Sequence, residues 1–199
     1  LGDIVEAVFK GLLKEAGVKY EDDKKVTLDL EGGTSVSGTY DIVIDGAVDD
    51  IKSASNWSYN NKFDCFETLS NGDPFGYIAQ LAGYAKASGK RAGGWWVVNK
   101  ANGEFKYVPA TGIDIEKEVN DIQQTVDALE ENKFERCFDA VPETFRGKET
   151  GNMVLDQNCV FCRYRFACWN GLEERPSIPS QAKQPKTVAY TSLKEEYKT

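Results

Sequence analysis

The segment richest in reactive side chains is GTYDIVIDGAVDDIKSAS, residues 38–55. Asp41 falls in one predicted strand, and Asp50 and Lys52 fall on one face of the next strand, because side chains of a strand alternate. Adjacent antiparallel strands bring Asp41 and Asp50 together, and such a buried pair is costly unless a cation lies between the carboxylates. Mg²⁺ or Mn²⁺ suits oxygen ligands, and Lys52 could then hold a water while the metal polarises a phosphate. The alternative is a solvated charge pair at a strand edge.

Two predicted helices supply further polar side chains. Gln80 and Tyr84 are four residues apart in a helix and therefore project from one face. Glu6 lies about 20° beyond the apolar stripe of the first helix, so its carboxylate borders the core. The alternatives are ordinary packing for the first two residues and a solvated glutamate for the third.

The elements that must position these residues follow from periodicity and turn signals. The predicted order is a helix ending near Gly17, strands at 25–30, 35–45 and 47–53, a polar loop at 54–72, a helix from Asp73-Pro74 to Gly89, a hairpin within 93–110 that turns at Asn102-Gly103, and a helix over about 113–135. The three strands are close in sequence and predict an antiparallel meander. Together the elements predict an α/β fold with a mixed central sheet flanked by helices.

The predicted loop at 54–72 carries aromatic side chains among polar ones, namely Trp57, Tyr59 and Phe63. Long loops in small domains are often functional, and interleaved aromatics suit stacking on single-stranded bases. The alternative is that these rings attach the loop to the core.

The ordered set of motifs resembles the RecB-like branch of the PD-(D/E)XK nucleases. The resemblance spans about residues 1–108 and is carried by Gly-x-x-x-Glu (Gly2 to Glu6), GTYDIVID, DDIK and QLAGY. It implies a restriction-endonuclease-like core. The implied metal ligands are Asp41, Asp50, the Ile51 carbonyl and Glu6, the last at a position where many relatives have histidine and some a carboxylate. The implied catalytic lysine is Lys52, and the implied substrate-contacting pair is Gln80 and Tyr84.

Three closely spaced cysteines near the C-terminus, Cys159-x2-Cys162-x5-Cys168, indicate a soft-metal site. The alternatives are buried apolar thiols or a disulfide. Tetrahedral zinc and a 4Fe–4S cluster each take four ligands. The sequence leaves three sources for the fourth: Cys137, Cys65 or a cysteine upstream of Leu1.

The spacing of this trio is similar to that in the CRISPR-adaptation exonucleases and AddB-type nuclease domains of the same branch. There it joins a cysteine placed before the nuclease core to bind a 4Fe–4S cluster. The resemblance therefore implies a 4Fe–4S cluster, with zinc as the alternative, that staples the DNA-binding region. It also implies that Arg163 and Arg165 face the phosphate backbone, the alternative being that both are solvated.

Composition excludes several classes of function. The 199 residues include no histidine, which removes Ser-His-Asp and Cys-His catalysis. No apolar run approaches the roughly 20 residues that span a bilayer, and no secretory signal is visible. We therefore expect a cytoplasmic location, bacterial or in the host of a phage. The net charge of −8 counts against a purely electrostatic nucleic-acid binder but is compatible with a metal-dependent enzyme.

These observations predict a nuclease core at 1–143, a cysteine-cluster region at 144–176 packed on it, and a loosely ordered tail at 177–199. The predicted function is a Mg²⁺- or Mn²⁺-dependent DNA exonuclease of recombination, repair or phage DNA metabolism. Its partner would be DNA with free ends or single strands. One alternative is a non-catalytic DNA-binding module with structural zinc or an iron–sulfur site, and another is a structure-specific endonuclease on the same scaffold.

Overall fold

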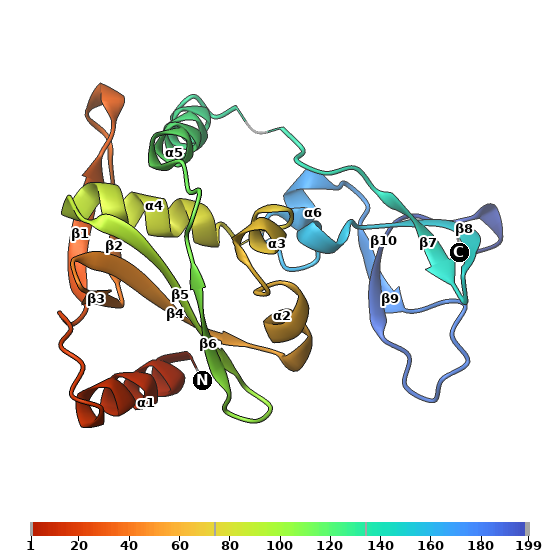
Figure 1. Ribbon diagram of the computed structural model, residues 1–199. Helices are drawn as coiled ribbons and strands as arrows, with labels where there is room; N and C mark the ends of the chain where they lie inside the picture. Colours follow the sequence, from red (N-terminus) through yellow and green to blue (C-terminus); the bar gives the residue numbers. More distant parts are fainter. Residues whose placement is uncertain (1, 74, 134, 198–199) are drawn as a thin grey trace. The chain divides into compact units, whose positions relative to one another are not determined.

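The computed structural model describes residues 2–73, 75–133 and 135–197 and divides the chain into two units, Leu1–Asn132 and Lys133–Thr199 (Figure 1). The sequence predicted a boundary eleven residues later, at 143/144. The segment between the two positions contains the beginning of a strand that pairs only within the second unit. Among the described residues, no helix combines the length and apolar character needed to cross a membrane.

The first unit is organised around a four-stranded mixed sheet with the order β3-β4-β5-β6. The strands are β3 (Ile42–Ile44), β4 (Ala47–Ala54), β5 (Arg91–Asn99) and β6 (Phe105–Pro109). β4 and β5 are parallel, whereas the outer pairs are antiparallel. Parallel neighbours need a long crossover, and the crossover from β4 to β5 contains α4 (Tyr77–Ser88). The structure thus confirms a mixed α/β sheet flanked by helices.

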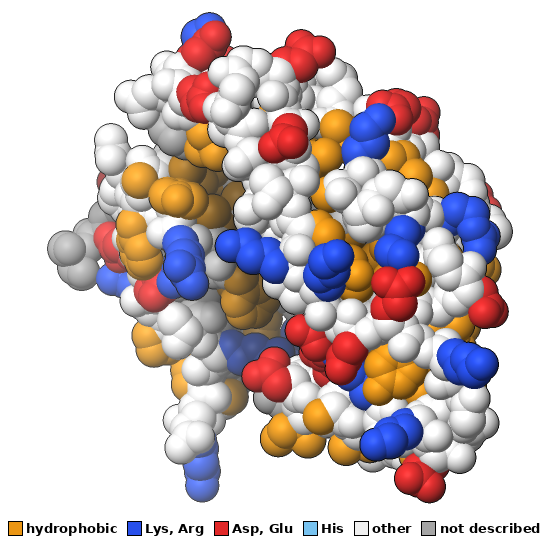
Figure 2. All heavy atoms as spheres, turned by 90° about the vertical axis from the view of Figure 1, so that its left-hand side faces the viewer, with side chains coloured by type: hydrophobic (Ala, Val, Ile, Leu, Met, Phe, Trp, Pro, Cys, Tyr) orange, Lys and Arg blue, Asp and Glu red, His pale blue; other side chains and the backbone are white. Residues whose placement is uncertain are grey.

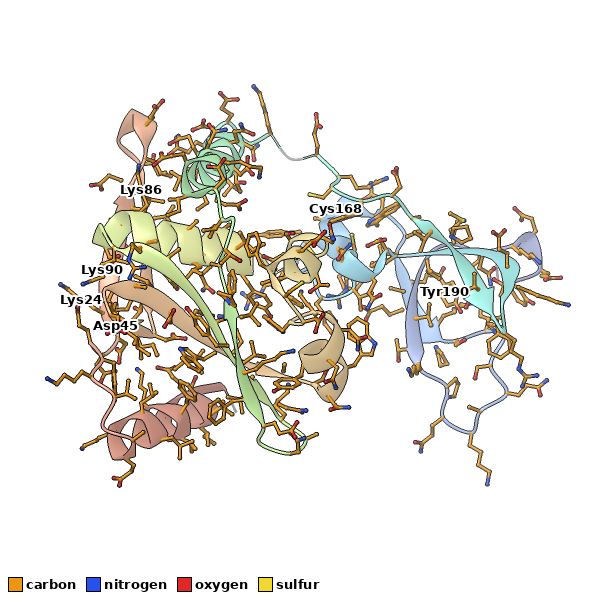
Figure 3. The ribbon with its side chains drawn as sticks, in the orientation of Figure 1. Lys24, Asp45, Lys86, Lys90, Cys168 and Tyr190 are labelled. Atoms are coloured by element: carbon orange, nitrogen blue, oxygen red, sulfur yellow. The ribbon has the colours of Figure 1, made fainter. Side chains whose placement is uncertain are left out.

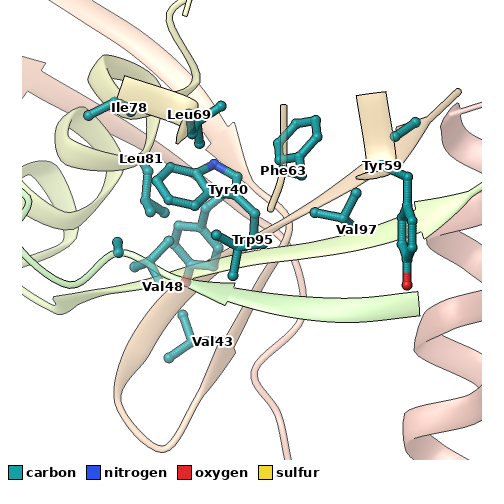
Figure 4. Close-up of a cluster of buried hydrophobic side chains, with 13 residues drawn as sticks. Tyr40, Val43, Val48, Tyr59, Phe63, Leu69, Ile78, Leu81, Trp95 and Val97 are labelled. Atoms are coloured by element: carbon teal, nitrogen blue, oxygen red, sulfur yellow. The ribbon is translucent and has the colours of Figure 1, made fainter. Parts of the chain in front are cut away.

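Two helices cover opposite faces of this sheet. The neighbouring residues Trp95 and Trp96 of β5 point to opposite faces, as strand alternation requires. Trp95 packs in the same apolar cluster as Leu81 of α4, and Trp96 packs against the cluster containing Phe9 of α1 (Gly2–Glu15). The α4 face carries the larger cluster, shown in Figure 4.

The predicted meander is wrong at Asp41. The strand predicted over 35–45 is divided into β2 (Ser35–Tyr40) and β3, and β2 pairs only with β1 (Lys24–Asp29) in a separate two-stranded sheet. The division coincides with the Asp41 side chain, whose Oδ2 accepts the Ile51 backbone N–H at 2.7 Å. This carboxylate therefore fixes the point where the chain leaves the hairpin and enters the central sheet.

The predicted loop at 54–72 instead contains two short helices, α2 (Asn56–Asn61) and α3 (Phe66–Ser70). Ser55 caps α2 by accepting the Ser58 N–H at 3.1 Å, a standard N-terminal signal that the polar composition obscured. Two of its aromatic residues, Tyr59 and Phe63, are buried in the core, while Trp57 is 69% exposed. The structure thus supports core attachment for two of the three rings.

The remaining predicted elements of this unit form with shorter bounds. α4 begins at Tyr77 with the Asp73 carboxylate accepting the Ile78 N–H at 2.8 Å, and Pro74 lies outside the described residues. The hairpin turns at Gly103, where φ is 79°. α5 (Ile115–Glu130) is capped by Asp114 and contacts the β1–β2 turn, because Gln123 bonds the backbone of Glu31 through both amide atoms.

The second unit is built on an antiparallel sheet with the order β7-β8-β10-β9. Its strands are β7 (Val141–Phe145), β8 (Lys148–Val154), β9 (Glu173–Pro176) and β10 (Thr187–Ser192), and its helix is α6 (Arg165–Cys168). The tail expected to be loosely ordered supplies the inner strand β10. Tyr190 of β10, labelled in Figure 3, is 1% exposed and donates a hydrogen bond to Glu143 at 2.7 Å.

Candidate functional site

The structure brings Asp41 and Asp50 together, as strand pairing predicts. Ile42 pairs with Asp49 in the antiparallel β3–β4 register, so the preceding residue, Asp41, lies beside Asp50. The hydrogen bond from the Ile51 N–H holds the Asp41 carboxylate against this part of β4. Asp50 is 2% exposed and Asp41 is half-buried, so the pair lies at the border of the core.

Burial and like charge make this pair electrostatically unfavourable. Burial, followed by the charge of Asp50, raises the pKa of Asp41 to about 6. Burial also raises the pKa of Asp50, against the opposing effect of Lys52. The charge of Glu6 raises both values, which places this α1 carboxylate within electrostatic range of the pair. Glu6 and Asp50 are thus each close enough to affect Asp41 electrostatically, and a cation among the three carboxylates would relieve their repulsion.

Glu6 is held in place by a lysine that the sequence analysis did not single out. Lys10, one turn further along α1, lies 2.7 Å from Glu6 and also contacts Asp22 and Asp23. These contacts, larger in total than the burial that opposes them, raise the pKa of Lys10. The i,i+4 spacing of Glu6 and Lys10 was the available sequence signal, whereas the two aspartates precede β1 and reach Lys10 only through the fold.

Lys52 connects the carboxylate pair to α4. Its Nζ lies 2.8 Å from Asp50 Oδ1 and 2.7 Å from Oδ2, and it donates to Gln80 Oε1 at 3.1 Å. Gln80 Nε2 in turn donates to the Tyr84 hydroxyl at 3.1 Å. The four side chains form one continuous polar chain. The pairing of Asp50 with Lys52 and that of Gln80 with Tyr84 were predicted from spacing, whereas the Lys52–Gln80 bond that joins them is a finding of the structure.

A glycine in the motif GTYDIVID makes room for the end of this chain. A Cβ built on Gly38 would lie 2.6 Å from a ring carbon of Tyr84, closer than side chains approach one another. Burial is the main cause that raises the pKa of Tyr84, so its hydroxyl stays protonated and can donate or accept hydrogen bonds. The hairpin strand β2 is therefore in contact with the tyrosine that orients Gln80.

Asp49 is a buried carboxylate that the sequence analysis passed over. It accepts the Tyr107 hydroxyl at 2.9 Å and the Trp96 indole N–H at 3.2 Å, on the opposite face of β4 from Asp50. Burial raises its pKa, and these hydrogen bonds oppose the rise. A Cβ on Gly93 would lie 1.9 Å from Asp49 Oδ1, so this glycine is needed for the carboxylate to fit.

The donor set of the first unit suits a hard divalent cation. Asp41, Asp50, Glu6 and the Ile51 carbonyl offer oxygen ligands of the kind that Mg²⁺ and Mn²⁺ take. Asp50 Oδ2 is buried and, although close to Lys52 Nζ, makes no well-formed hydrogen bond. Within residues 2–73, 75–133 and 135–197, no group of three or more acidic, cysteine or histidine side chains is arranged to hold a metal ion. The Lys52 ammonium supplies the positive charge beside Asp50.

In the second unit, the three cysteines of the predicted soft-metal site and Cys137 are near enough to affect one titrating thiol. All five cysteines of the chain are free thiols. Burial raises the pKa of Cys159, and the charges of Asp156, Cys162, Cys137 and Cys168 raise it further. The other three thiols are therefore each within electrostatic range of Cys159, although no three cysteines among the described residues are arranged to hold a metal ion. Cys65 lies in the first unit, where its backbone N–H is bonded by Thr68 as part of the α3 cap.

Arg136, the neighbour of Cys137 in the sequence, contacts the end of α6. The Arg136 guanidinium lies 3.7 Å from the centre of the Trp169 ring and donates to the Cys168 carbonyl at 2.7 Å. The segment that carries Cys137 is thus attached to the end of α6, where Figure 3 labels Cys168.

The two arginines expected to face DNA are in different environments. Arg165 is ion-paired with Glu174 at 2.9 Å and donates to the Cys162 carbonyl at 3.1 Å, so it stabilises the cysteine loop. Arg163 is exposed. In the face seen in Figure 2, basic and acidic side chains are interspersed, with no broad basic surface.

Comparisons with known proteins add little to this geometry. No family model matches the chain, and no curated protein matches it. A solved structure titled "Crystal structure of SSO0001" is 17% identical, with a TM-score of 0.43, over 63% of this chain and 58% of that chain. The chain therefore matches less than two thirds of that chain's length, and a likeness this weak indicates neither a shared fold nor a shared function.

Proposed function

We propose that the chain is a divalent-metal-dependent nuclease that hydrolyses phosphodiester bonds at DNA ends, on a restriction-endonuclease-like core of the RecB-like kind. The observation that carries the proposal is the position of Lys52, with its ammonium between the buried Asp50 carboxylate and Gln80. A lysine ammonium has three N–H donors, and Gln80 gives Lys52 a second, directional partner besides Asp50. Here the amide of Gln80 aims the ammonium, and the Tyr84 hydroxyl aims the amide.

The proposed site divides the chemistry between carboxylates and lysine. Asp41, Asp50, the Ile51 carbonyl and Glu6 would hold Mg²⁺ or Mn²⁺, which supplies charge stabilisation for the phosphate and acidifies a bound water. Lys52 would orient the attacking water and lend positive charge as the phosphorane-like transition state develops. Gln80 and Tyr84 fix the direction of the Lys52 ammonium, so that the water is held in one place.

The decisive experiment uses end-labelled single- and double-stranded DNA with Mg²⁺ or Mn²⁺. We expect metal-dependent cleavage by the parent chain and none by Lys52→Ala, which is assayed below its unfolding transition because the change leaves the buried Asp50 carboxylate without its ion-pair partner. Lys90→Ala is the matched control, because Lys90 is also ion-paired, to Glu21 at 2.8 Å, but on the surface. Cleavage by Lys52→Ala at the parental rate would remove Lys52 from the mechanism. No cleavage by the parent with any divalent ion would favour a non-catalytic DNA-binding module.

We further propose that Cys159, Cys162, Cys168 and Cys137 hold a 4Fe–4S cluster or zinc, which would staple the second unit. The support is that Cys162, Cys168 and Cys137 each lie within electrostatic range of Cys159, and that the Arg136 contact brings the segment of Cys137 beside α6. A thiolate centre would cross-link a unit with a small core, because its buried residues in the described ranges are Glu143, Asn152, Leu155 and Tyr190.

Anaerobic purification followed by absorption spectroscopy and metal analysis tests the centre. A broad visible band with about four iron atoms per chain indicates the cluster, and colourless protein with one zinc indicates the alternative. We expect Cys137→Ser to lose the metal and Cys65→Ser to keep it. The reverse result, or retention by both variants, would assign the fourth ligand elsewhere.

A further inference from the structure

Two aromatic rings and a second lysine continue from Lys52 toward the surface. The Lys52 Nζ lies 5.1 Å from the centre of the Tyr77 ring, at the beginning of α4. Phe75 stacks on Tyr77 with ring centres 5.7 Å apart and an interplanar angle of 28°. Lys62, at the end of α2, lies 5.0 Å from both ring centres. We call Phe75, Tyr77 and Lys62 the aromatic platform.

Burial decreases along this row of rings. Phe63 is 3% exposed and packs against Tyr77 with ring centres 5.6 Å apart. Tyr77 is half-buried, and Phe75 is 62% exposed. The core therefore fixes the inner ring and Tyr77, while the outer ring presents apolar surface to solvent beside a cation. An exposed ring that is already oriented loses little conformational freedom on binding a ligand.

Lys62 is placed to meet an anion. Burial lowers the pKa of Lys62, and the charge of Asp73 opposes this effect. Its ammonium is partly desolvated over two ring faces, so an arriving phosphate would replace weak contacts with a charge-assisted hydrogen bond. An aromatic face with an adjacent cation matches a nucleotide, whose base offers a π-face and whose backbone offers a phosphate.

We propose that the aromatic platform binds one nucleotide of a single DNA strand, with its base against Phe75 and a phosphate at Lys62, next to the scissile phosphate at the proposed metal site. The proposal rests on the proposed function and specifies its substrate class as single-stranded ends. In a duplex, base faces are covered by neighbouring base pairs, so an internal nucleotide could not stack on Phe75. The platform thereby favours single strands over duplexes.

The test measures equilibrium binding of the full chain to a fluorescently labelled single strand and to a blunt duplex of equal length, in EDTA so that no cleavage occurs. We expect Phe75→Ala to weaken single-strand binding roughly tenfold or more, the loss typical of one base–aromatic stack, without changing duplex binding. Phe75→Trp should restore it. Lys62→Met should reduce the slope of log K against log salt by about 0.7, as expected for one phosphate contact with a single strand.

Phe105→Ala is the matched control, because Phe105 of β6 is 51% exposed and packs with Phe9 and Trp96 on the α1 side of the sheet. Unchanged single-strand binding by Phe75→Ala, or equal losses for Phe75→Ala and Phe105→Ala, would overturn the platform, as would a parent chain that does not bind single strands. A separate cleavage assay with Mg²⁺ distinguishes the two proposals. Lys52-dependent cleavage that is indifferent to Phe75 retains the nuclease and removes the platform. Phe75-dependent binding without cleavage would retain the platform and remove the nuclease.

Discussion

Asp49 and Asp50 are neighbours in β4 and are both buried, at 3% and 2% exposure, yet they face opposite sides of the sheet and have different partners. Asp49 is surrounded by neutral donors, the hydroxyl of Tyr107 and the indole of Trp96. Asp50 faces a second carboxylate and a lysine that is shared with Gln80. A buried carboxylate with satisfied hydrogen bonds contributes to the fold. A buried carboxylate close to other carboxylates costs stability and is typical of a site that binds a cation.

The largest expected effect separates the two aspartates by activity. Asp50→Asn should lower metal-dependent cleavage at least about 100-fold, because it removes a metal ligand and the charge that holds Lys52. The same change should not lower the melting temperature in EDTA, because the raised pKa of Asp50 means that its buried charge is unfavourable. Cleavage rates and melting curves measure both effects.

Asp49→Asn should behave in the opposite way. Loss of the carboxylate leaves the Tyr107 or Trp96 donor poorly paired and should cost about 1–3 kcal/mol of unfolding free energy, measured by urea titration. Cleavage below the unfolding transition should change by only a few-fold. Equal losses of activity for the two variants would contradict the distinction between the faces of β4.

A smaller effect concerns the pH dependence of the metal-free protein. Asp41 has a pKa of about 6 in the folded chain against 3.8 as its ordinary value, so the folded state binds its proton more tightly than the unfolded state does. Stability from this group is therefore present below about pH 4 and is lost as the pH rises through 6. In EDTA, the melting temperature of the parent should fall between pH 4.5 and 7 relative to that of Asp41→Asn. Added Mg²⁺ should reverse the fall above pH 6, and a parallel course of the two curves would contradict the assignment.

The smallest effect tests how the hairpin positions the site. Gly38→Ala places a methyl group 2.6 Å from the Tyr84 ring, so the ring must move and Gln80 loses its orientation. We expect cleavage to fall roughly tenfold, an effect of misplacement rather than of lost chemistry. Gly83→Ala is the control in α4, where the new methyl group meets Ile122 at an ordinary 3.6 Å. It should keep full activity and gain up to about 1 kcal/mol of stability from helix propensity.

Much of the candidate site could be predicted from local patterns. Alternation along a strand places Asp50 and Lys52 on one face, and the spacing of Gln80 and Tyr84 places them on one helix face, because these relations depend only on backbone geometry. The family resemblance implied only that Gln80 and Tyr84 contact substrate near the metal, and the Lys52–Gln80 hydrogen bond that joins the two pairs is known from the structure alone. The helices and the hairpin were predicted for the same local reasons, namely periodicity and turn residues. The mixed sheet followed from the order of those elements along the chain.

Relations between distant segments were decided only by the tertiary structure. The partners of Asp49 come from β5 and β6, and the two aspartate partners of Lys10 precede β1. No spacing along the sequence could indicate these contacts. The residues after 177 are polar and proline-containing and predict a loose tail, yet β10 is ordered by strands on both sides. In the sequence Phe75 is a single aromatic residue with no marked pattern around it. It becomes part of a platform only because Lys62 and Tyr77 contact its ring in the folded chain. Side-chain direction follows from the local backbone, whereas burial and charge environment depend on which segments the whole chain packs together.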